Sequence, residues 1–278
     1  MTALGEYLRA RRALLRPADV GLPSTARRRV PGLRREEVAL LAGISADYYL
    51  QLEQGRDRRP SAEILTALAG ALRLDGAATA HLFALTMPAP GRPPPDPSVP
   101  PRLLRMLAAW AETPAYVQND LFDVLAANDL ALDLSPLHRP GVNLVREAFR
   151  APLPPGPDPR PDLVACLRGL ADQSDPSLNS LVSELSATSG EFRRLWSRHD
   201  VRGHTSGRLA FDHPDAGRIE LSFERMIVPS APGRHLVVYT ADRDSPSEAA
   251  LRTVARRARH RSALPPDPRP SPGGRLSR

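Results

Sequence analysis

The chain has 278 residues, which is enough for two domains of ordinary size, and its single cysteine, Cys166, excludes an internal disulfide. The net charge of +7 divides unevenly: residues 1–88 carry +4, residues 89–251 carry −4 and residues 252–278 carry +7, so only the two ends are expected to contact polyanions. No segment reaches the roughly 18 consecutive apolar residues of a membrane-spanning helix, and we therefore expect a cytoplasmic protein without membrane insertion.

The first predicted helix covers residues 4–15, because leucines recur on one of its faces and arginines on another. Proline and glycine interrupt residues 17–33 repeatedly, so this segment is predicted to be a loop. The loop carries Arg27, Arg28 and Arg29. Two interpretations stay open for these arginines: a solvated loop, or a group that binds phosphate or enters a minor groove of nucleic acid.

Residues 35–54 (REEVALLAGISADYYLQLEQ) predict two short helices around a forced turn, the helix-turn-helix unit that docks in the major groove of DNA. The bend is placed at Gly43, since a positive φ costs glycine little. Ala39 is small enough to let the two helices approach closely. The buried face of the first helix is expected to contain Val38, Ala39, Leu41 and Ala42.

The second helix of this unit is predicted to begin after Ser45, whose hydroxyl is well placed to cap the first turn. Ile44 is expected to fill the corner, with Tyr49 and Leu52 pointing to the core. The opposite face is the candidate reading surface and contains Ala46, Asp47, Tyr48 and Gln51. A plain helical hairpin is the simpler interpretation, but the small residue, the glycine and the apolar residues all fall at the offsets of the docked pair.

Two further helices complete an all-α domain of five helices, which we assign to residues 1–87. Ser61 is predicted to cap the fourth helix, and the fifth runs through residues 77–85. Eight of the fourteen residues from Pro88 to Pro101 are proline, which predicts a semi-rigid spacer over residues 88–101.

Residues 102–262 are predicted to form an α+β domain with an antiparallel sheet. A helix at 103–111 precedes two short strands within 115–128, and three or four helices fill residues 130–200. The later strands show alternating apolar and polar residues, at 209–211, 219–223 and 236–241. A last helix covers about 246–261, and the basic tail at 263–278 is predicted to be disordered.

The segments PGLRREEVALLAGIS (31–45) and DYYLQLEQGR (47–56) resemble the Xre-type transcriptional regulators, specifically the MmyB-like subgroup. Four later segments resemble the ligand-binding domain of that subgroup: TPAYV (113–117), FDVLAAN (122–128), EFRRLWSRHDVR (191–202) and LVVYTADRDSPSEAAL (236–251). The resemblance implies a lambda-repressor-like first domain and a PAS-like second domain. It also implies that the second domain binds a small apolar ligand such as a fatty acid.

We therefore interpret the chain as a sequence-specific DNA-binding transcriptional regulator and not an enzyme. It is expected to bind double-stranded DNA as a homodimer on a near-palindrome, and to join the nucleoid when bound. Gln51 is expected to pair with adenine, Asp47 to accept from cytosine, and Tyr48 to contact a thymine methyl or a phosphate. The residues expected at the DNA are Arg27, Arg28, Arg29, Arg34, Arg35, Ser45, Ala46, Asp47, Tyr48 and Gln51.

Large apolar residues of the second domain are candidates for lining an effector pocket, and ordinary core is an equally good interpretation of them: Leu107, Trp110, Phe122, Phe149, Trp196 and Phe223. Two alternatives stay open for this domain: a protein-interaction or dimerisation module without a ligand, or an enzyme that uses His199 and His204. His199 is placed on the buried face of a helix, and Cys166 in the core. No metal site or cofactor is expected, because no ligand pair has the spacing of a zinc site.

Overall fold

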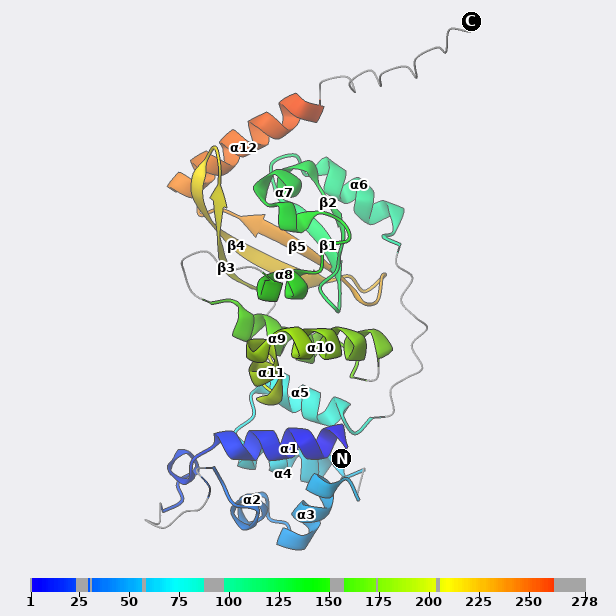
Figure 1. Cartoon of the computed structure of the whole chain (residues 1–278), viewed down its shortest axis with the longest axis vertical. Helices are drawn as coiled ribbons and strands as arrows, with labels where there is room; N and C mark the ends of the chain where they lie inside the picture. The colour runs from blue at the N-terminus through cyan, green and yellow to red at the C-terminus, as the bar shows by residue number, and fades with distance from the viewer. Residues whose placement is uncertain are drawn as a thin grey trace, which may run out of the picture.

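The computed structural model describes residues 2–23, 30, 32–56, 59–87, 98–150, 158–173, 175–203 and 206–262, with side chains as far as residue 257. Its elements are stacked along the long axis (Figure 1). Two short helices lie at one end, a β-sheet lies in the other half, and a long C-terminal helix lies at the far end (Figure 1). A layer of helices separates the sheet from the N-terminal domain.

The described residues of the first domain form five α-helices, as predicted, and a short 3-10 helix lies within the segment that was predicted to be a loop. Their bounds are α1 Ala3–Leu14, η1 Pro17–Val20, α2 Arg35–Ala42, α3 Ala46–Gln54, α4 Ala62–Ala71 and α5 Gly76–Ala84. Side-chain oxygens cap four of these helices at residues that the sequence favours for that position: Thr2 for α1, Ser45 for α3, Ser61 for α4 and Asp75 for α5.

The second domain contains more helices than predicted between residues 130 and 200, because two of them have only six and seven residues. The described elements are α6 Pro101–Ala109, β1 Ala115–Asn119, β2 Val124–Ala127, α7 Asp129–Leu134, η2 Pro136–His138, α8 Leu144–Arg150, α9 Arg160–Leu170, α10 Pro176–Thr188, α11 Gly190–Ser197, β3 Ser206–His213, β4 Gly217–Ile227, β5 Arg234–Thr240 and α12 Pro246–Ser262. Helices this short make fewer than two turns, so they leave little periodicity for sequence analysis to detect.

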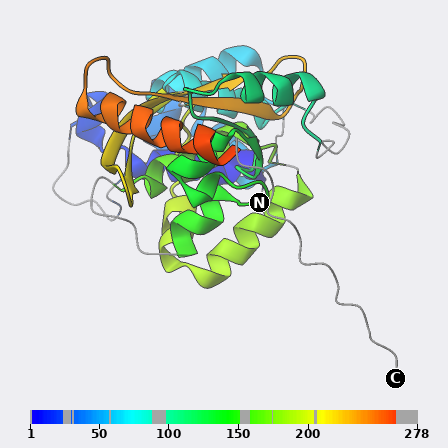
Figure 2. The same ribbon diagram turned by 90° about the horizontal axis from the view of Figure 1, so that it is seen from above.

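All five strands form one antiparallel sheet in the order β2-β1-β5-β4-β3. The chain leaves the sheet after β2, builds helices α7–α11, and returns to the opposite edge, so β5 pairs with β1 in the centre. Both faces are covered: α7 and α12 pack on Val237 and Leu221, whereas α6 packs on Val117 and Leu236. Figure 2 shows α6 and α12 on opposite sides of the sheet.

Helices α8–α11 enclose a separate apolar cluster, built around the fully buried Leu167 and Phe192. This helical layer lies between the sheet and the first domain (Figure 1). Cys166 is buried within the cluster, which confirms the prediction that this thiol lies in the core. Most of the expected proline spacer lies outside the described residues, and its last residue, Pro101, is the first residue of α6.

Candidate nucleic-acid interface

The turn between α2 and α3 has the geometry that the sequence predicts. Gly43 ends α2 with a φ of +67°, and its amide donates back to the Ala39 carbonyl. Two residues later, the Ser45 hydroxyl accepts a hydrogen bond from the Tyr48 amide at 3.1 Å. Because the glycine stops one helix and the serine starts the next, the angle between α2 and α3 is fixed by local backbone interactions.

Side chains on the inner faces of α2 and α3 hold this unit against the domain core. Val38 and Ala39 from α2 are buried, and Tyr49 and Leu52 from α3 are fully buried. The position of Leu41 differs from the prediction, because this side chain is 37% exposed. Helix α2 has only eight residues, and its buried stripe is narrower than the four positions that the sequence suggested.

The outer face of α3 gathers the expected base-reading residues. Ala46, Asp47 and Gln51 are exposed, and Tyr48 is half-buried with its ring packed against the domain core. Helix α3 lies at the end of the molecule away from the sheet, where no element of the second domain lies in front of it (Figure 1). The described part of the chain therefore leaves this face open to a large partner.

Glu53, a fully buried carboxylate on the inner side of α3, was not among the predicted site residues. Its Oε1 lies 2.7 Å from Arg12 Nε, and its Oε2 lies 2.7 Å from Arg35 Nε. Burial alone would raise the pKa of Glu53, but the hydrogen bonds and charges of both arginines outweigh burial, so its pKa lies below the usual value. The available signal was its position: Glu53 follows Leu52 and lies one turn after Tyr49, on the buried face.

The arginines that were expected at phosphates fall into three groups. Arg34 is exposed directly before α2, and its amide donates to Glu37 Oε2 at 2.6 Å. Arg35 is held by Glu53, although 44% of its side chain remains exposed, so it is both anchored and accessible. Arg27, Arg28 and Arg29 lie outside the described residues.

The six residues proposed for an effector pocket lie in three different apolar clusters. Phe122, Phe149 and Trp196 belong to the α8–α11 cluster, where Phe192 lies 5.2 Å from the Phe149 ring and 5.8 Å from the Trp196 ring. Leu107 and Trp110 belong to the cluster beneath α6, and Phe223 belongs to the face beneath α12. The structure thus brings three of the six together.

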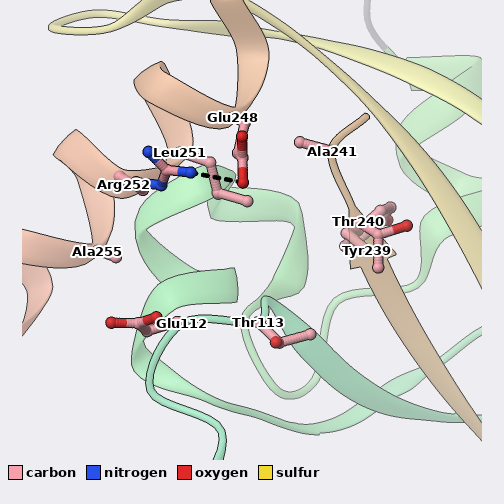
Figure 3. Close-up of a pocket in the computed structure, with 9 residues that line it drawn as sticks. All are labelled: Glu112, Thr113, Tyr239, Thr240, Ala241, Glu248, Leu251, Arg252 and Ala255. Carbon is pink, nitrogen blue, oxygen red and sulfur yellow. Dashed lines mark ion pairs between the residues drawn. The ribbon is translucent and has the colours of Figure 1, made fainter. Parts of the chain in front are cut away.

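A cavity of about 210 Å³ opens elsewhere, where the first turns of α12 pass the end of β5 and the loop before β1 (Figure 3). Leu251 and Ala255 of α12 provide apolar lining, and the tips of Glu248 and Arg252 form an ion pair at 2.7 Å (Figure 3). The acid Glu112 lines the opposite wall. Ligand pockets usually measure about 300–1,000 Å³, so this cavity is small for an acyl chain and is more charged than such a chain prefers.

The histidines considered for catalysis do not form one group among the described residues. His199 follows the end of α11 instead of continuing its buried face, and its ring lies against Tyr7 of α1 at 6.3 Å. His213 is the last residue of β3, and its Nδ1 accepts from the Asp215 and Ala216 amides of the β3–β4 turn. His204 lies outside the described residues, and within those residues no three His, Cys, Asp or Glu side chains are grouped as metal ligands.

Comparison with known protein families gave two matches that divide the chain in the same way as the structure. A family model described as a helix-turn-helix domain matches residues 3–82, which contain α1–α4 and all but the last two residues of α5. A model described as an MmyB-like transcription regulator ligand binding domain matches residues 99–254. No curated protein matches the chain. None of the helices in the described residues combines the length and the apolar character needed to cross a membrane.

Proposed function

The chain belongs to the MmyB-like transcription regulators, and from that premise we propose that α3 is the recognition helix, which reads base edges in the major groove. A DNA-binding helix-turn-helix domain and a ligand-binding domain together make the protein a transcription regulator. Both families point to a transcription regulator, a class of protein that is usually not an enzyme.

The observation that carries this proposal is the division of α3 into two faces. Its inner face is fixed by Tyr49, Leu52 and Glu53, so its outer face is presented at a constant angle. Gln51 is exposed on that outer face and has a carboxamide that can pair bidentately with adenine. Asp47 would accept from a cytosine amino group, while Arg34, Arg35 and the Arg27–Arg29 group would contact phosphates.

Selection of duplexes from a random pool, followed by binding measurements on variants, tests these roles. Gln51→Ala is expected to lose about 1–3 kcal/mol on the selected duplex and to relax preference at one base pair. Arg34→Ala is the matched comparison, because it should weaken all duplexes alike and lower the salt dependence by about one unit. Equal losses on selected and random duplexes for both variants would contradict the assignment of Gln51.

We further propose that the second domain binds a small apolar molecule such as a fatty acid. The aromatic side chains of the α8–α11 cluster support this proposal, since they would give an acyl chain an apolar lining. The small cavity under α12 would not hold such a chain, so binding requires α8–α11 to separate slightly. Bound ligand would change the placement of the two DNA-binding domains of a homodimer, provided that it binds the two arrangements with different affinities.

Titration of delipidated protein with fatty acids tests the ligand proposal. Trp196 fluorescence is expected to change on binding, measured in a Trp110→Phe background so that Trp196 is the remaining tryptophan. Affinity for the selected duplex is expected to change with it. If neither quantity responds to any chain length, the second candidate is favoured: a dimerisation or protein-interaction module without a ligand, which the small size of the α12 cavity already supports.

A further inference from the structure

Helix α1 is connected on one side to α3 and on the other side to the second domain (Figure 1). Two adjacent arginines make these connections. Arg11 Nη1 lies 2.9 Å from Asp200 Oδ1, directly after α11, and Arg12 Nε lies 2.7 Å from Glu53 Oε1 in α3. One helical turn of α1 therefore contacts both α3 and the segment that follows α11.

The contact with the second domain is apolar as well as ionic. Val201 is 6% exposed and packs into the core of the first domain, although it belongs to the segment between α11 and β3. The His199 ring lies against Tyr7 of α1, and the Tyr7 hydroxyl donates to the Ala78 carbonyl of α5 at 3.1 Å. His199 and Asp200 thus contact α1 directly, and Val201 is buried in the core to which α1 belongs.

The same segment is attached to the apolar cluster of the ligand-binding helices. Arg168 of α9 is 4% exposed, and its guanidinium carbon lies 3.7 Å from the centre of the Trp196 ring. Arg168 Nη2 donates to the Trp196 carbonyl at 2.6 Å, and the Arg202 amide donates to the Ala165 carbonyl at 3.1 Å. Trp196 and Arg202 are therefore both held by α9, on either side of residues 199–201.

On the other side, α1 and α3 are in direct backbone contact. A Cβ atom added at Gly5 would collide with the Glu53 carbonyl oxygen, so no side chain separates the two helices there. The Glu53 carboxylate also forms ion pairs with Arg12 of α1 and Arg35 of α2. Because this contact has no flexible side chain to absorb a shift, a movement of α1 changes the packing of α3.

We propose that α1 couples the two domains within one protomer: docking of residues 199–201 on α1 sets the stability and orientation of α3. This inference rests on the proposed function of α3 and adds to it the route by which the second domain regulates DNA binding. The coupling acts through a packed contact inside one chain, and so it is separate from any rearrangement between the two chains of a homodimer. Such coupling must be reciprocal: a change that weakens the contact of α1 with residues 199–201 must also weaken its contact with α3, and the reverse.

Hydrogen exchange of the full-length chain, followed peptide by peptide, tests the coupling. Arg11→Gln and Asp200→Asn are each expected to speed exchange in α1 and in residues 46–54 of α3 by about two- to fivefold, which is the size expected for a partly exposed ion pair. The double variant should show no more than either single variant, because both remove the same pair. Val201→Ser, which removes buried apolar contact, should give a larger change of about tenfold.

Arg198→Gln is the matched control. Arg198 Nε lies 2.7 Å from the same Asp200 carboxylate, but it belongs to the second domain, so its loss should leave exchange in α3 unchanged. Thermal unfolding of each variant confirms that the chain is folded. The coupling is refuted if Asp200→Asn and Val201→Ser are folded and change exchange around residues 195–203 while α1 and α3 exchange as in the wild type.

A second experiment measures hydrogen exchange in the presence of the duplex that the wild-type protein selects. Binding of this duplex is expected to slow exchange around residues 195–203 in the wild type, and Asp200→Asn should abolish this distant effect while α3 is still protected. A slowed α3 with no distant effect in the wild type would overturn the coupling. Failure to select any duplex would instead count against the proposed function, and the comparison of variants without DNA would still decide the coupling.

Discussion

At the scale of a single residue, the carboxylate of Glu53 links three helices of the first domain through hydrogen bonds. It accepts from Arg12 of α1 and Arg35 of α2 while belonging to α3, and water does not reach it. A buried charge of this kind adds little by itself, but removing one partner leaves uncompensated charges in the core. Glu53 is therefore expected to be intolerant of neutral substitution.

Glu53→Gln is expected to lower the free energy of unfolding by about 3–5 kcal/mol, because Arg12, whose side chain is only 13% exposed, loses its buried counter-charge. Urea denaturation at neutral pH measures this loss. Glu184→Gln is the control, since Glu184 pairs with Arg146 on the surface with 48% of its side chain exposed, and should lose no more than about 1 kcal/mol. Equal losses would show that the burial of Glu53 is unimportant.

His81 of α5 is expected to make the stability of the folded protein sensitive to acid. Burial, with the charge of Arg168 as a second cause, lowers the pKa of His81 from 6.5 to about 4. The unfolded histidine therefore takes up a proton below pH 6.5 while the folded one does not, so stability falls as the pH drops from 6.5 to about 4. The loss amounts to about 1.4 kcal/mol per pH unit for this histidine, with none expected above pH 6.5.

The pH series of unfolding free energies should therefore be less steep between pH 6.5 and 4 for His81→Gln than for the wild type. His199, whose pKa burial also lowers to about 4, adds a slope of the same sign and keeps some dependence in the variant. An unchanged slope in His81→Gln would mean that His81 titrates normally in the folded protein.

Among the helices, the close approach of α1 to α3 depends on the absence of a side chain at Gly5. Gly5→Ala is expected to push the two helices apart and to cost about 1–3 kcal/mol in thermal unfolding. Gly70→Ala in α4 is the control, because Gly70 is also helical but has nothing within 4 Å, and it should be neutral or stabilising by up to about 1 kcal/mol. Destabilisation of both variants to the same extent would remove the steric explanation.

Prediction of these elements from sequence succeeded where the signal is local. Gly43 and Ser45 act on their own backbone within a few residues, so the turn, the cap and the outer face of α3 could be predicted. Leu41 was assigned wrongly because an eight-residue helix does not define its buried stripe sharply. The later strands of the second domain were predicted from alternation, whereas the order of the strands depends on pairings that alternation does not encode.

The contact between the domains could not be predicted, because its partners lie far apart in the chain. Arg11 and Asp200 are separated by 189 residues, and each alone is an ordinary surface charge in sequence. Val201 follows a helix whose own pattern gives no reason for burial in another domain. Periodicity describes one element at a time, so a contact made by two elements leaves no trace in it.

At the scale of the whole molecule, α3 and α12 lie at opposite ends of the long axis (Figure 1). In the proposed arrangement, with DNA bound to α3, a second protomer can approach from the side without covering this helix. We expect two chains per selected duplex, with half-site centres about 34–36 Å apart. Sedimentation of the complex measures the stoichiometry, and one chain bound to a single half-site would contradict the homodimer.

The division of labour on α3 has an evolutionary consequence. Ala46, Asp47 and Gln51 are exposed, while the side chains that hold the helix in place are on its other face. Mutations at these three positions can therefore accumulate without unfolding the domain, and a duplicated gene could acquire new target promoters while it keeps the same response to its effector. Regulators of this architecture can diversify their regulons faster than their scaffolds.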